Sequence, residues 1–149
     1  MIKRTHLAIG AFLALLFLEQ VRYKLVFIPV VLLASLLPDI DSAYSYLGHH
    51  KVFRPLQFFV RHRGLIHSFT FCVAISVLLA FFFPVVALGF FVGYAGHLFS
   101  DSLTVEGIRP FWPLEKESVG KIRVGGRIET GVFTALCIAD AVLFVGLFI

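Results

Sequence analysis

The sequence predicts an all-α integral membrane protein, a polytopic helical bundle of about five spans. Of the 149 residues, 59% are hydrophobic, and the mean hydropathy is +0.94. A water-soluble domain of this size cannot bury so much apolar surface. The charged residues, 15% of the chain, collect between apolar runs, which is typical of polytopic membrane proteins. We expect residues 1–149 to form one transmembrane helical domain.

Five apolar runs define the expected helices. They are Leu7–Leu18, Leu25–Leu37, Phe69–Phe83, Val85–Phe99 and Thr130–Ile149. Only the last run reaches the ~20 residues that a full span needs. The first two runs are shorter, so they must borrow flanking polar residues or thin the bilayer locally. A count of four spans therefore stays open.

The ends of two of these runs need separate arguments. Lys3 and Arg4 precede an apolar stretch, as in a signal peptide, but the sequence around Glu19 offers no small-residue cleavage site. We expect a retained first span. Pro84 interrupts the stretch from Phe69 to Phe99, which is too long for one span, so two helices joined by a hairpin are expected there.

The distribution of Lys and Arg predicts the orientation. With five spans, the N-terminus and the segments 39–67 and 101–129 share one side, and this side carries eleven of the thirteen Lys and Arg residues. By the positive-inside rule, that side is cytoplasmic, which indicates the plasma (inner) membrane. The net charge of +4 comes from residues that border spans, so anionic lipids explain it better than a nucleic-acid partner.

Eight potential metal ligands fall on this same cytoplasmic side. They are His6, Asp39, Asp41, His62, His67, His97, Asp101 and Glu129. The positions of the spans are predicted from hydropathy, and the cytoplasmic side is predicted from the distribution of Lys and Arg. The convergence of the eight residues is therefore an independent observation.

Their spacing fits metal binding. His97 and Asp101 are four residues apart, so both side chains lie on one face of a helix. Asp39 and Asp41 follow Pro38 and present two carboxylates on a short polar turn, which suits divalent cations. Each pattern alone is of limited specificity.

A second segment supplies imidazoles and positive charge. His62 and His67 are five residues apart, and Gly64 frees the backbone between them. Arg61 and Arg63 flank the first histidine as candidate phosphate-binding groups. Arg109, in a later segment on the same side, is a third candidate for this role.

Ordinary structural roles also explain several of these residues. A lone interfacial His, or an acid such as Asp39 or Glu129 at a helix end, is about as often a polar surface residue or a cap. For the whole set this explanation fails, because burying the acids and imidazoles without a cation costs several kcal/mol. His49 and His50 have no spaced partner, and Asp140 lies alone in an apolar run, so we assign them no chemistry.

At these residues the chain resembles the membrane-bound metal-dependent hydrolase family that includes the LexA-regulated YdjM-like proteins. The shared elements are His6, Leu-Leu-Pro-Asp-Ile-Asp-Ser at 36–42, His-Arg-Gly-Leu-Ile-His-Ser at 62–68, Gly-Tyr-Ala-Gly-His-Leu-Phe-Ser-Asp-Ser-Leu-Thr at 93–104 and Phe-Trp-Pro at 111–113. The family continues with Thr-Gly-Gly/Ser-x-x-Glu, which residues 124–129 match except that Val124 replaces Thr. The order of His and Asp residues is also similar to that of the zinc-dependent phospholipase C and nuclease group, all-helical enzymes that cleave phosphoesters at clustered zinc ions.

We therefore expect a hydrolase that acts on a phosphoester of a membrane lipid or lipid-linked intermediate. Two or three divalent ions, zinc before manganese, would lower the pKa of a bound water toward ~7 and polarise the phosphoryl oxygens. Asp41 or Glu129 is the expected general base. Arg61, Arg63 and Arg109 would orient the phosphate.

Two alternatives use the same ligands. A metal or proton transporter usually holds its site near the bilayer midplane, whereas these residues lie at span ends. A structural membrane protein would use the metal only to tie helix ends together. A closed structural site uses every coordination position, and a catalytic site leaves one open for water, so ligand count separates these two functions.

Overall fold

The computed structural model describes residues 1–41, 49–50, 54, 64–147 and 149. These residues form five α-helices and no strand, so the predicted all-α class is confirmed for this part of the chain. The helices are α1 Lys3–Leu16, α2 Lys24–Ala34, α4 Phe69–Phe82, α5 Pro84–Ser102 and α6 Arg127–Gly146, and two 3₁₀ turns, η1 Leu18–Gln20 and η2 Leu37–Asp41, flank α2.

Each predicted apolar run contains most of one helix. The expected break at Pro84 is confirmed, because α4 ends at Phe82 and α5 begins at Pro84, where the proline occupies the first turn. The start of α4 is set by Ser68, whose hydroxyl oxygen accepts a hydrogen bond from the Phe71 N–H at 3.1 Å. Such a cap contributes about 1 kcal/mol.

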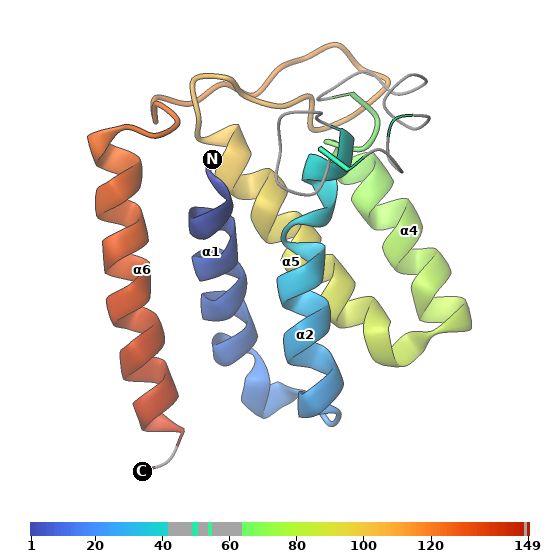
Figure 1. The fold of residues 1–149 in the computed structure, drawn as a ribbon. Helices are drawn as coiled ribbons and strands as arrows, with labels where there is room; N and C mark the ends of the chain where they lie inside the picture. The colour runs from blue at the N-terminus through green and yellow to red at the C-terminus, as the bar shows by residue number, and fades with distance from the viewer. Residues whose placement is uncertain (42–48, 51–53, 55–63, 148) are drawn as a thin grey trace.

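Successive helices run in opposite directions, with α5 in the middle of the bundle (Figure 1). Helix α5 packs against α1, α2 and α4, and α6 lies along α1. The N-terminus of α1, the η2 turn, the C-terminal end of α5 and the start of α6 therefore all lie at one end of the bundle. Most of the candidate metal ligands that the structure describes come from these elements.

Many large apolar side chains point away from the bundle. Leu25, Phe81 and Val142 are 90%, 81% and 65% exposed, which is unusual for a soluble protein but suits a lipid environment. Helix α6 has 20 residues, and only 6% of its most apolar stretch is buried inside the protein. It is therefore not a core helix.

Only α6 among the described residues is long and apolar enough to cross a membrane by length and composition. Helix α2 has 11 residues, or about 16 Å at 1.5 Å per residue, whereas the hydrocarbon core is about 30 Å thick. The structure therefore contains the five expected helices in the residues it describes, and among them only α6 meets the length and composition needed for a full span.

A close approach between α2 and α5 depends on Gly93. A Cβ atom at this position would lie 2.2 Å from the Val31 carbonyl oxygen and 2.9 Å from the Ala34 Cβ. No larger residue fits without moving the α2 backbone. Because His97 follows one turn later on α5, this contact also fixes its position relative to α2.

We predict that Gly93→Ala destabilises the protein by about 1–3 kcal/mol, the usual cost of overpacking a tight interface. Thermal unfolding of the purified protein in detergent measures the change. Gly131→Ala is the matched control, because nothing lies within 4 Å of a Cβ atom there. Alanine also favours a helix by about 1 kcal/mol over glycine, so the control should not destabilise. Equal losses in both variants would contradict the packing argument.

Candidate metal centre

A buried group of imidazoles and carboxylates lies at the end of the bundle described above. His6 comes from α1, His67 from the segment before α4, and His97 and Asp101 from α5. All four are at most 2% exposed. Asp39, from η2, completes the group, and its side chain is 23% exposed. We call these five residues the His–Asp cluster.

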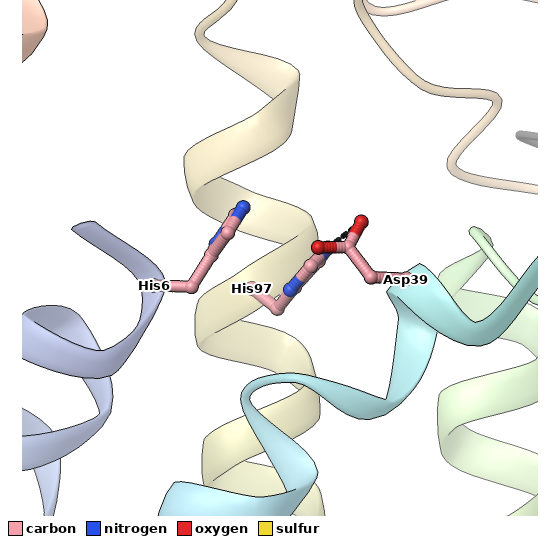
Figure 2. A group of neighbouring side chains, drawn as sticks. All are labelled: His6, Asp39 and His97. Carbon is pink, nitrogen blue, oxygen red and sulfur yellow. Dashed lines mark ion pairs between the residues drawn. The ribbon is translucent and has the colours of Figure 1, made fainter. Parts of the chain in front are cut away.

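The ligand atoms of the cluster face one another. His97 Nε2 lies 3.6 Å from Asp101 Oδ2 and 3.9 Å from Asp39 Oδ1. His67 Nε2 lies 3.8 and 3.9 Å from the same two oxygens. Figure 2 shows His6 and Asp39 on either side of His97. Two triplets each have their ligand atoms within 4.8 Å of one another: His6 with Asp39 and His97, and His67 with His97 and Asp101.

Hydrogen bonds on the outer side of two rings set the orientation of these histidines. The Nδ1 atom of His97 lies 2.7 Å from the Ser35 carbonyl oxygen, and that of His67 lies 2.9 Å from Asp41 Oδ2. Both partners are acceptors, so each Nδ1 carries the proton and donates it. In a neutral imidazole the Nε2 lone pair then points at the centre of the cluster.

His6 differs from the other two histidines. Its Nδ1 atom lies 3.1 Å from Ser100 Oγ, which donates to the His97 carbonyl oxygen at 2.8 Å. Its Nε2 atom lies 3.1 Å from the Met1 carbonyl oxygen, which can only accept, so this nitrogen carries a proton, and it faces Asp101 Oδ1 at 3.4 Å. The rings of His6 and His97 stack with centroids 3.8 Å apart.

This arrangement fits a divalent cation. His97 Nε2 is buried and has no hydrogen-bond partner among the described residues, although carboxylate oxygens surround it. Lone pairs that face anionic oxygens repel each other unless a positive charge lies between them. The Met1 amino group already forms an ion pair with Asp101. Imidazole nitrogen and carboxylate oxygen, with the second ring nitrogen hydrogen-bonded outside, form a donor set typical of zinc and of manganese.

Two predicted ligands lie beside the cluster and make other contacts. Asp41 is 3% exposed and accepts the hydrogen bond from His67 Nδ1, so it holds that ring. Both carboxylate oxygens of Glu129 accept backbone N–H groups, from Ile2 at 2.7 Å and from Gly125 at 2.6 Å. Glu129 therefore joins the start of α1 to the start of α6. Metal binding by these two acids, expected from the sequence, is untested, and their observed contacts favour roles that orient His67 and join the two helices.

The predicted phosphate-binding arginines are not part of the described cluster. Arg109 is paired with Glu117, with Nη2 and Nε at 3.0 and 3.2 Å from Oε1, in an exposed segment between α5 and α6. Arg61, His62 and Arg63 lie outside the described residues. Their predicted roles are therefore untested.

Two functional contacts were absent from the sequence-based prediction. Ser100 lies against Nδ1 of His6, a contact between α5 and α1 that the local spacing of residues does not indicate. The Ser35 carbonyl oxygen orients His97, but a backbone carbonyl is present at every residue. No sequence pattern marks which one will accept the bond.

Comparison with protein families matches residues 1–147 to a family described as YdjM inner membrane protein. Two curated relatives, each named Inner membrane protein YdjM, come from Escherichia coli (strain K12) and Shigella flexneri. Each is 35% identical over 98 residues, which covers 58% of this chain and 48% of the relative. The chain thus matches about half the length of these relatives. Their names support an inner-membrane location. No solved structure matches the chain.

We predict that Glu129→Gln lowers the thermal unfolding midpoint but leaves the metal content unchanged. The amide NH₂ of Gln cannot accept the second backbone N–H, and a buried N–H group left without a partner costs about 1–3 kcal/mol. Glu117→Gln is the control, because its carboxylate is 54% exposed and a surface pair contributes about 0–1 kcal/mol. Loss of metal from Glu129→Gln would instead identify this acid as a ligand.

Proposed function

Because this chain belongs to the YdjM family of inner membrane proteins, we propose that its His–Asp cluster is the metal site of a hydrolase that cleaves a phosphoester of a membrane lipid or lipid-linked intermediate. One observation carries the proposal: three buried imidazoles turn their Nε2 atoms toward two carboxylates, and only Asp39 reaches the surface. The order of these residues along the chain, similar to that in zinc-dependent phospholipase C, supports phosphoester chemistry.

The two triplets share His97, and one imidazole nitrogen binds one ion. We assign a first ion, zinc before manganese, to His67, His97, Asp39 and Asp101. His6 and the other oxygen of Asp101 would contribute to a second ion, since Asp101 Oδ1 faces His6 and Oδ2 faces the other two rings. Such an ion would replace the Met1 amino group, which pairs with this oxygen in the structure. When bound, such ions make water a better nucleophile and polarise the phosphoryl oxygen.

The reaction itself is a substitution at phosphorus. The water loses one proton as its oxygen forms a bond to phosphorus. The P–O ester bond breaks, and its electron pair leaves with the ester oxygen, which takes up one proton, so the proton count is unchanged overall. Asp39, as the exposed member of the cluster, lies where water and substrate enter. Asp41 and the Ser35 carbonyl hold His67 and His97 in place, which keeps their Nε2 atoms directed inward.

We propose that all five helices cross the membrane and that the cluster faces the cytoplasm. In the sequence, eleven of the thirteen Lys and Arg residues belong to the N-terminus and to the segments 39–67 and 101–129, which supports this orientation. The short helices α1 and α2 would thin the bilayer around them. The cluster lies at the ends of helices, near the level of lipid headgroups, and this position favours an enzyme over a transporter.

We predict that His97→Ala lowers zinc affinity by more than about 100-fold, since loss of a ligand costs more than the 10–100-fold typical of a residue that only orients one. Elemental analysis and zinc titration of detergent-purified protein measure this. His50→Ala is the control, because His50 is an exposed histidine outside the cluster. Equal zinc binding by both variants would contradict the proposal that the His–Asp cluster is a metal site.

Activity is tested on the same proteins. Wild-type protein and His50→Ala should release phosphate or a phosphorylated headgroup from lipid phosphoesters in a zinc-dependent manner, and His97→Ala should not. If the protein binds metal but hydrolyses none of the lipid phosphoesters, the hydrolase proposal is contradicted. The structural alternative, in which the metal only holds α1, η2 and α5 together, is then supported.

We further predict that Asp41→Asn weakens zinc affinity by about 10–100-fold while the fold is retained. The amide is uncharged and holds the His67 Nδ1 proton less strongly, so the ring is less basic and less firmly oriented. Zinc titration with a competing chelator measures the affinity, and thermal unfolding of the metal-free protein checks the fold. Unchanged affinity would show that Asp41 does not act through His67.

A further inference from the structure

An apolar cavity of about 390 Å³ lies next to the His–Asp cluster, which is within the size range of ligand-binding pockets. It is formed by η2, the segment before α4, α4 and α5. Its walls include Leu37, Ile40, Ile66, Ile75, Phe90 and Tyr94.

Little in this cavity suits a polar ligand. Apart from Tyr94, every residue of its wall is aliphatic or a phenylalanine. The Tyr94 hydroxyl donates to the Ile66 carbonyl oxygen at 2.7 Å, so its one proton is already used. Water or a polar group in this space would lose hydrogen bonds, whereas a hydrocarbon would not.

The wall of the cavity is continuous with the cluster. On α5, the residues Phe90, Tyr94, His97 and Asp101 are spaced by four, three and four, which places them along one face of the helix. On α5 the cavity therefore ends where the cluster begins.

Two of the other three walls show the same continuity. In η2, Asp39 lies between Leu37 and Ile40, which both line the cavity. In the segment before α4, His67 directly follows Ile66. Three separate elements thus each contribute residues to both the cavity and the cluster.

The cavity also lies on the inner side of the cluster along the bundle. Helix α5 runs from Pro84, at the far end, to Ser102, at the cluster end. At 1.5 Å per residue, Tyr94 and Phe90 lie about 5 and 10 Å deeper than His97. A lipid has the same order of parts, with its phosphate at the surface and its hydrocarbon chain below.

We propose that this cavity binds one hydrocarbon chain of the lipid substrate while the phosphoester lies at the His–Asp cluster. The proposal rests on the proposed function for the identity of the headgroup chemistry. An inner membrane protein is surrounded by such chains, and an apolar side pocket that opens beside a ligand cluster selects a substrate with a chain attached close to its phosphate.

The test is photo-crosslinking of phosphatidic acid that carries a diazirine in its acyl chain, with the zinc-loaded protein in phosphatidylglycerol and phosphatidylethanolamine vesicles. Mass spectrometry locates the label. Wild-type protein should be labelled at the cavity wall on α4 and α5. Ile75→Trp, which fills the cavity, should lose at least about tenfold of this label, equivalent to ~1.4 kcal/mol of binding. Val77→Trp, on the same helix but 64% exposed, should keep it.

A competition experiment needs no variant and covers the case in which Ile75→Trp fails to fold. Excess unlabelled dioleoyl phosphatidic acid should displace the label from the wild-type cavity, and the dibutyryl form should not. Label spread evenly over exposed α4 and α6 residues, or insensitive to the long-chain competitor, would mean annular lipid only and would overturn the proposal.

The crosslinking result is independent of hydrolysis. Displaceable label in the cavity without phosphate release would support the chain-binding site and count against the proposed function. Zinc-dependent phosphate release with no displaceable label would support the proposed function and overturn the chain-binding site. A drop in label for Val77→Trp equal to that for Ile75→Trp would also overturn the chain-binding site, because bulk on the lipid-facing side does not change the cavity.

Discussion

The burial of three imidazoles and one carboxylate beside the partly exposed Asp39 is the constraint on which the rest of the structure depends. Taken out of water, these groups are unfavourable unless every outer nitrogen finds an acceptor and the inner atoms share a positive charge. The Ser35 carbonyl oxygen and Asp41 meet the first condition for His97 and His67, and Ser100 Oγ lies beside Nδ1 of His6. The second condition is the basis of the proposed metal site.

Helix packing supplies the geometry that this cluster needs. The absence of a side chain at Gly93 lets α2 approach α5, and the residue that follows α2, Ser35, then offers its carbonyl oxygen to His97. The same approach carries η2, and with it Asp39, over the end of α5. Helix packing and ligand orientation are thus consequences of one contact.

The cluster and the apolar cavity lie on the inner faces of the helices, and the outer faces are apolar and exposed. One face of α5 carries the cavity wall and two cluster residues, while the outer faces of α4, α5 and α6 expose phenylalanine, leucine and valine. A site at helix ends, beside an apolar cavity and with one exposed carboxylate, suits a substrate that is itself part lipid and part phosphate. A purely structural ion would require neither the cavity nor the exposed edge at Asp39.

The sequence by itself determined the helices and the candidate ligands, because hydropathy runs, Pro84 and the four-residue spacing of His97 and Asp101 are local properties. All five members of the His–Asp cluster were among the eight expected ligands. Only the tertiary structure decided which acids bind backbone N–H groups, as Glu129 does, and which pair with another side chain, as Glu117 does with Arg109. It also decided that an apolar cavity adjoins the cluster. The physical reason is that backbone donors and acceptors have no sequence signature, and cavities arise from the distance between helices that are remote in the chain.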